Sequence, residues 1–115
     1  MAFAVAVAKL CEELRLKPIA WNTAGQLLDA STSMAANYRA TSRSRSRAEW
    51  NSKIGVVAEE SDEAVHWLAF IDASHFADRE RVTPLLNEAK ELRAIFAASA
   101  GTSRRNSKRR RIKDR

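Results

Sequence analysis

One run of side chains between residues 50 and 71 constrains the fold of this chain more than any other feature. Seven positions follow one another at alternating spacings of four and three residues: Trp50, Ile54, Val57, Ser61, Ala64, Leu68 and Ile71. This spacing is that of one face of an amphipathic α-helix. Ser46 and Glu49, just before the run, have the form of a capping box, in which two otherwise unpaired backbone N–H groups are satisfied reciprocally. The pattern predicts a helix over residues 46–72.

Two helical stripes precede this helix in the sequence. The first consists of Phe3, Val7, Leu10 and Leu14 and predicts a helix over about residues 2–15. The second consists of Ala20, Ala24, Leu27, Ser31, Met34 and Tyr38. Pro18 is suited to the first position of the second helix, and Thr23 with Gln26 also resembles a capping box, so two starts remain open.

A fourth stripe follows a connection over residues 72–78. Its members are Val82, Leu85, Ala89, Leu92, Phe96 and Ser99. The helix starts either near Asp78 or at Thr83, which precedes a proline, and Gly101 is a typical stop. Four such stripes, short connections and no strand-like alternation predict an all-α fold, an antiparallel up-down-up-down four-helix bundle over residues 1–100. Residues 101–115 have no apolar periodicity, which predicts a disordered basic C-terminal tail.

Two features of these helices suggest contacts beyond a simple bundle. Small residues on or beside the second stripe (Ala30, Ser31, Ala35 and Ala36) would let a neighbouring backbone approach closely. Gly25 lowers helix stability by roughly 1 kcal/mol relative to alanine, so a close contact is one reason for its presence. Val65 and Trp67 lie off the stripe of the third helix and predict a second apolar face there.

The positive charge of the chain is concentrated in two segments. The net charge is +6, and residues 101–115 alone carry +7, which leaves −1 for the first hundred residues. A second group of arginines surrounds the turn between the second and third helices. The candidate nucleic-acid-binding residues are Arg39, Arg43, Arg45, Arg47, Arg104, Arg105, Lys108, Arg109, Arg110 and Arg111. Arg39, Arg43 and Arg47 are four residues apart and would share one face if helix continued through the turn. The competing interpretation is a solvated turn and a tail that only improve solubility.

The sequence offers no constellation for catalysis, and we expect no cofactor. Cys11 is the single cysteine, which excludes an internal disulfide and fits a reducing, cytoplasmic location. Glu63 and His66 have Glu-x-x-His spacing, but a di-metal bundle site needs that motif on two helices. The three glycines are isolated, so no phosphate-binding loop is present. The apolar run over residues 2–8 is shorter than the roughly 20 residues needed to span a membrane, so we expect no membrane association.

Three segments resemble one known family. The segments QLLDASTSMAANYRA, SRAEWNSKIGVVAEESDEAVHWLAFI and LLNEAKELRAIFAAS are similar to the bacterial four helix bundle protein family, also called intervening-sequence proteins of large-subunit ribosomal RNA genes. The family pattern is QLL-x-x-x-TS-x-x-ANYREA, then AEF, then E-x-x-x-YWL. The likeness covers about residues 3–100. This chain departs from the pattern at Ala40 and Thr41, where Glu-Ala is usual, and at Trp50, where Phe is usual.

The resemblance implies a function as well as a fold. Related proteins include the accessory protein of diversity-generating retroelements, which forms a five-fold barrel of bundles and binds nucleic acid and a reverse transcriptase. We therefore expect a non-enzymatic homo-oligomer, a pentamer, that binds RNA or DNA through its arginine clusters. The alternative expectation is a structural or adaptor protein whose partner is another protein, such as a reverse transcriptase.

Overall fold

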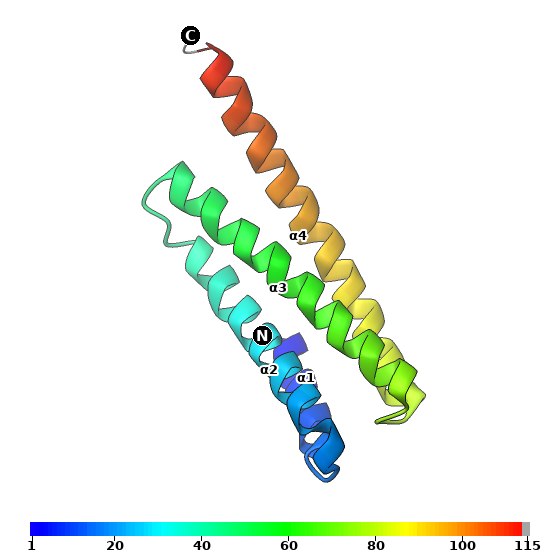
Figure 1. The fold of residues 1–115 in the computed structure, drawn as a ribbon. Helices are drawn as coiled ribbons and strands as arrows, with labels where there is room; N and C mark the ends of the chain where they lie inside the picture. Colours follow the sequence, from blue (N-terminus) through cyan, green and yellow to red (C-terminus); the bar gives the residue numbers. More distant parts are fainter. Residues whose placement is uncertain (114–115) are drawn as a thin grey trace.

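The chain folds into four α-helices. They are α1 (Ala2–Leu14), α2 (Trp21–Thr41), α3 (Arg47–Ser74) and α4 (Arg79–Lys113), with a short 3₁₀ turn, η1 (Pro18–Ala20), before α2. The computed structural model describes the backbone of residues 1–113, and beyond Thr102 it describes only the side chains of Arg105, Lys108 and Arg109. Each helix runs antiparallel to the one before it, and α3 lies between α2 and α4 (Figure 1). The predicted all-α four-helix fold is confirmed, and the described residues contain no strand.

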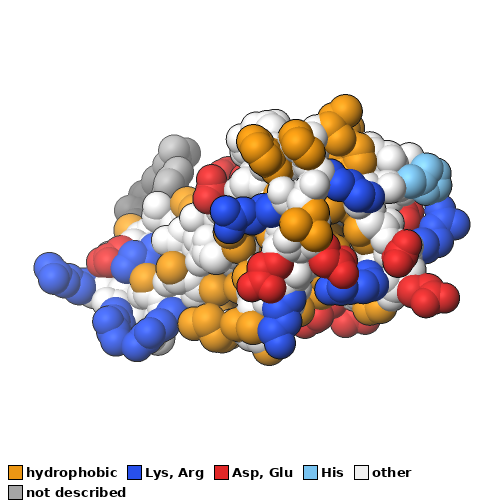
Figure 2. All heavy atoms as spheres, turned by 90° about the horizontal axis from the view of Figure 1, so that it is seen from below, with side chains coloured by type: hydrophobic (Ala, Val, Ile, Leu, Met, Phe, Trp, Pro, Cys, Tyr) orange, Lys and Arg blue, Asp and Glu red, His pale blue; other side chains and the backbone are white. Residues whose placement is uncertain are grey.

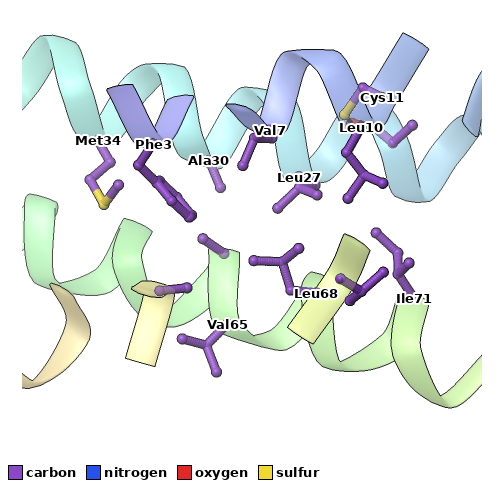
Figure 3. Packing of buried hydrophobic residues seen from close by; sticks show 14 of the residues in the cluster. Phe3, Val7, Leu10, Cys11, Leu27, Ala30, Met34, Val65, Leu68 and Ile71 are labelled. Carbon is purple, nitrogen blue, oxygen red and sulfur yellow. Dashed lines mark hydrogen bonds between the residues drawn. The ribbon is translucent and has the colours of Figure 1, made fainter. Parts of the chain in front are cut away.

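The predicted stripes form one hydrophobic core. Leu10, Leu27, Leu68 and Ile71 are fully buried and come from three helices, whose side chains meet between the ribbons in Figure 3. Ile54 and Phe96 belong to the same cluster. Because each stripe repeats at the helical period, its members face one direction and pack against the stripe of a neighbouring helix.

The helix starts differ in detail from the sequence-based expectations. Pro18 opens η1, and α2 begins at Trp21, between the two predicted starts; α4 begins at Arg79, next to the first of its two predicted starts. Ser46 is the N-cap of α3, and its Oγ accepts a hydrogen bond from the backbone N of Glu49 at 3.0 Å. In a capping box the Glu49 carboxylate would accept a hydrogen bond from the backbone N of Ser46. Here it accepts from the backbone N of the preceding residue, Arg45, at 3.1 Å. At its other end α3 runs to Ser74, two residues past the predicted boundary.

The second apolar face of α3 is used inside the chain. Val65 is buried in the core and points away from α1 and α2 in Figure 3, and Trp67 is half-buried against the same core. Because α3 packs against both α2 and α4, it needs two apolar faces in a single copy of the chain. The close approach suggested for Gly25 does not occur within the described residues, since a Cβ there would meet no heavy atom within 4 Å.

The last helix extends beyond the core. Ala100 is the last buried residue of α4 among the described side chains, yet the helical backbone continues through Gly101 to Lys113. The sequence predicted a stop at Gly101 and disorder after it. Glycine lowers helix stability by only about 1 kcal/mol, and arginine and lysine are good helix formers, so residues 101–113 contain no strong helix breaker. At 1.5 Å per residue the 35 residues of α4 measure about 52 Å, close to the 58 Å longest dimension of the molecule.

Candidate nucleic-acid interface

The fold brings both basic segments to the same end of the bundle. The end of α2, the start of α3 and the last turns of α4 lie at one end, opposite the α1–α2 and α3–α4 connections (Figure 1). Thr102 of α4 lines the same cleft as Ser46 and Arg47, so the two segments are neighbours although about 55 residues separate them in sequence. We call this region the basic end, defined by residues 39–53 and 98–113.

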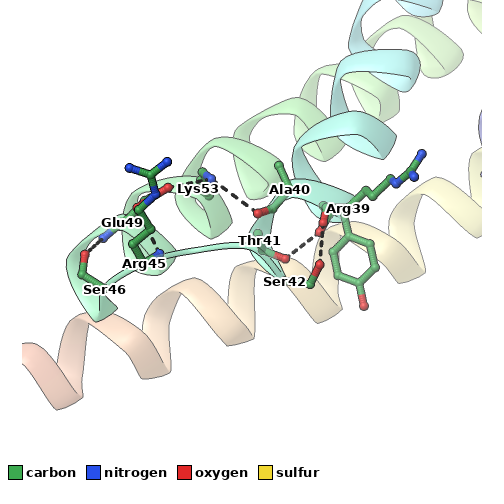
Figure 4. Close-up of polar contacts among 9 residues, drawn as sticks. Arg39, Ala40, Thr41, Ser42, Arg45, Ser46, Glu49 and Lys53 are labelled. Atoms are coloured by element: carbon green, nitrogen blue, oxygen red, sulfur yellow. Dashed lines mark hydrogen bonds and ion pairs between the residues drawn. The ribbon is translucent and has the colours of Figure 1, made fainter.

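The four arginines near the turn do not share one helical face. The helix α2 ends at Thr41, so the spacing of four that joins Arg39 and Arg43 does not continue to Arg47. Arg39 and Arg43 line a groove of about 450 Å³ beside the start of α1, whereas Arg47 lines the cleft against α4. Arg39 and Arg45 extend in different directions in Figure 4. The turn therefore presents positive charge over a broad surface rather than along one stripe.

The four arginines near the turn have no acidic partner among the residues that the structure describes. In the described part of the chain, none of the guanidinium groups of residues 39, 43, 45 and 47 lies within ion-pair distance of a carboxylate. Outside the basic end three arginines are paired, Arg79 with Asp72, Arg81 with Glu13 and Arg93 with Asp62, whereas Lys9, Arg15 and Lys90 have no ion pair among the described residues. In Figure 2 several Lys and Arg side chains gather at one end, while acidic and basic side chains alternate over the rest of the visible face.

Glu49 is the carboxylate that lies within this end. It pairs with Lys53 at 2.8 Å, and Lys53 Nζ also donates to the carbonyl of Ala40 at 3.4 Å (Figure 4). The hydrogen bond from Lys53 and that from the Arg45 backbone hold the pKa of Glu49 below its usual value. Glu49 is therefore ionised at neutral pH, and its contacts tie the end of α2 to the first turn of α3.

The described tail residues are exposed and basic. Arg105, Lys108 and Arg109 are all exposed, and Arg105 Nη2 donates to Thr102 Oγ1 at 3.1 Å. The side chains of Arg104, Arg110 and Arg111, which the sequence also suggested, lie outside the described residues. Tyr38, the last member of the predicted second stripe, is more than half exposed, and its ring centroid lies 5.3 Å from that of Phe96.

Other candidate groups offer no reactive site. Burial raises the pKa of the Cys11 thiol to about 11, and its Sγ donates to the carbonyl of Ala24 at 3.5 Å. A thiol with this pKa is almost entirely protonated at neutral pH, and the thiolate is the nucleophile. Glu63 and His66 are exposed, and the described residues contain no group of three or more potential metal ligands. Within the same residues, no helix is long and apolar enough to cross a membrane.

One residue of the basic end was assigned to the core from the sequence. Trp50 continues the apolar stripe of α3, but it is 37% exposed and lines the cleft between α3 and α4. Its position in the first turn of α3, four residues after the N-cap, is the sequence signal that could have placed it at the rim of the core.

Comparison with solved structures finds the same fold elsewhere. A protein of unknown function from the S23 ribosomal protein family of Bacteroides thetaiotaomicron superposes with a TM-score of 0.79. The two chains share 24% identity, and the match covers 86% of this chain and 92% of the other. This similarity shows the helical fold. No protein-family model matches the chain, and neither does any curated protein.

Proposed function

We propose that this protein is a non-enzymatic, homo-oligomeric helical bundle that binds RNA or DNA through its basic end. The observation that carries the proposal is the meeting of two basic segments, distant in sequence, at one end of the bundle. Four of the arginines there have no acidic partner among the described residues. Arginines unpaired within the protein remain available for phosphate oxygens, which a guanidinium contacts in a bidentate manner.

The opposite end of the bundle has a different charge balance. There Arg81 pairs with Glu13, Arg79 pairs with Asp72, and Lys17 Nζ donates to the carbonyl of Phe76 at 2.9 Å. The molecule is therefore electrically polar along its long axis. A polyanion approaching it is oriented toward the basic end by long-range electrostatics. Solubility alone would not require the basic residues to gather at one end.

The experiment is a fluorescence-anisotropy titration of labelled RNA and duplex DNA at several salt concentrations. Three proteins are compared: the full chain, a chain lacking residues 102–115, and a variant with Arg39, Arg43, Arg45 and Arg47 changed to Gln. A matched control changes four cations outside the basic end, Lys9, Arg15, Arg79 and Lys90, to Gln and so alters the net charge equally. Circular dichroism checks that each variant remains folded.

The expected results follow from counterion release. If about four to six tail cations engage duplex phosphates, that segment contributes about −4 to −5 to the slope of log K against log salt. Removing residues 102–115 therefore flattens the slope and weakens binding to all sequences alike. The four Arg→Gln changes reduce the remaining affinity, whereas the matched control leaves it nearly unchanged. Weak, salt-insensitive binding by the full chain, or an equal loss in the control, would refute the proposal.

The proposed assembly uses another part of the surface. Leu16 and Ile19, in the connection between α1 and α2, are 83% and 78% exposed, and Trp21 beside them is 59% exposed. Large apolar side chains gathered at one place are typical of protein contact surfaces. We propose that this apolar end contacts further copies of the chain in a ring, a pentamer, which would repeat the basic end and raise its effective affinity.

The same apolar end favours a second candidate function. A structural or adaptor protein would use these side chains to hold another protein, such as a reverse transcriptase. In that case the full chain would be monomeric alone, and the anisotropy titration would show no steep salt dependence.

A further inference from the structure

A polar cleft of about 800 Å³ lies within the basic end. One wall is the turn between α2 and α3 with the first turn of α3, and the other is α4. The lining residues are Thr41, Ser42, Ser44, Ser46, Arg47, Trp50, Asn51, Ala98, Ser99 and Thr102. The volume falls within the range of roughly 300–1,000 Å³ that is usual for small-molecule sites.

The chemistry of the first wall suits a phosphate group. Arg47 supplies a cation, and Ser46 is the N-cap of α3, a helix of 28 residues. The backbone N–H of Glu49 donates to Ser46 Oγ, while those of Arg47 and Ala48 have no acceptor within the first helical turn. Backbone N–H groups at a helix start and the positive end of its dipole favour an anion. Hydroxyl groups from both walls add further hydrogen-bond donors, and the buried Ser44 Oγ has no partner among the described residues.

The opposite wall carries a residue that binds a second arginine. Thr102 lines the cleft, and its Oγ1 accepts a hydrogen bond from Arg105 at 3.1 Å. Arg105 is therefore hydrogen-bonded to a residue of one wall, while Arg47 belongs to the other wall.

Trp50 supplies an aromatic surface inside this polar cleft. It is 37% exposed, so about a third of its surface remains accessible at a position that the apolar stripe would otherwise bury. An exposed indole beside a cationic phosphate site is the combination by which proteins bind unpaired nucleotides, with the base stacked on the ring. The bases of a duplex are already stacked on one another and cannot enter such a cleft without unpairing.

We propose that this cleft binds an unpaired nucleotide of single-stranded RNA or DNA, with its base stacked on Trp50 and its phosphate held by Arg47 and the start of α3. The inference rests on the proposed function and specifies the form of nucleic acid bound. The tail and the remaining arginines contact phosphates of any strand, and the cleft adds a preference for single strands.

The test compares Trp50→Leu with Trp50→Phe in the full chain. Labelled oligouridylate, oligothymidylate and a mixed-sequence duplex of the same length are titrated at one salt concentration, and thermal melts check folding. Base stacking contributes roughly 1–3 kcal/mol, so Trp50→Leu is expected to weaken single-strand binding by about 5- to 150-fold. Trp50→Phe, which keeps an aromatic ring, retains most of that affinity. Duplex binding is expected to be the same in all three proteins.

A second readout is independent of affinity. Stacking of a base on an indole quenches the fluorescence of the indole. Oligothymidylate is therefore expected to quench the tryptophan fluorescence of the unmodified chain. The quenching is expected to be lost in Trp50→Phe even though this variant still binds, because Trp21 and Trp67 lie outside the cleft.

The outcomes separate this inference from the proposed function. Equal losses on duplex and single strands, or quenching that persists in Trp50→Phe, would overturn the cleft assignment while leaving a nucleic-acid-binding basic end. The cleft assignment would also be overturned if duplex binding were tight and salt-dependent while Trp50→Leu left the affinity for single strands unchanged. Absence of salt-dependent binding to every probe would overturn both.

Discussion

Replacing Leu68 with alanine tests the central packing of the bundle. Leu68 has no exposed surface and lies in the core cluster formed by all four helices. The change removes three carbon groups, each worth about 0.8 kcal/mol of transfer free energy, which sets a lower bound of about 2.4 kcal/mol. A residual cavity adds to this value, because a core supported from several helices collapses incompletely, and comparable substitutions lower the free energy of unfolding by about 2–5 kcal/mol.

Urea unfolding followed by circular dichroism measures this loss. The midpoint is expected to fall while the dependence of the free energy on urea stays constant, since the surface exposed on unfolding changes little. Ile95→Ala is the matched control, because Ile95 is 58% exposed and lies outside both the proposed apolar end and the basic end. A loss below about 1 kcal/mol for Leu68→Ala, or an equal loss in the control, would refute the assignment of the α3 stripe to the core.

Two further predictions concern assembly and the buried thiol. Light scattering is expected to give a mass of five times 12.9 kDa for the full chain. A variant that combines Leu16→Ser and Ile19→Ser is expected to have a mass closer to that of the monomer. A full chain that is monomeric would contradict the proposed assembly. Cys11 is expected to resist alkylation at pH 8 in the folded protein and to react after denaturation, because burial raises its pKa from 9.0 to about 11. Between pH 9 and about 11 the thiol is protonated in the folded chain and deprotonated in the unfolded chain. The free energy of unfolding is therefore expected to fall as the pH rises through this range, and to fall less in Cys11→Ala.

The fold could be predicted from the sequence because its signal is local. Alternating spacings of four and three residues depend only on helix geometry, and the stripe of α3 is buried from Ile54 to Ile71. The N-cap at Ser46 follows from the same local chemistry. The cations of both basic segments whose side chains are described are exposed, and their role in binding stays a prediction.

The spatial arrangement of the candidate site could not be predicted in the same way. Whether Arg39 and Arg47 share a face depends on where α2 ends, and that end has no proline or glycine to mark it. The cleft arises from the relative lengths of α3 and α4, which bring Thr102 opposite Arg47. The exposure of Trp50 could be predicted only in part: its place in the first turn of α3 indicates the rim of the core, but not that it lines a cleft against α4.

The core residues and the candidate nucleic-acid-binding residues of this molecule are different sets. The helices α3 and α4 are antiparallel, and α4 has 35 residues against 28, so at 1.5 Å per residue it is about 10 Å longer. The core ends near Ala100, and the exposed Arg105, Lys108 and Arg109 of α4 follow it, while the arginines of the turn are exposed as well. Because the residues that hold the bundle together are not those proposed to contact a polyanion, substitutions in the two sets are expected to act on different free energies. Leu68→Ala and the arginine substitutions are therefore expected to be additive in stability, and a folded Leu68→Ala variant that keeps its oligomeric state is expected to bind nucleic acid as tightly as the unmodified chain.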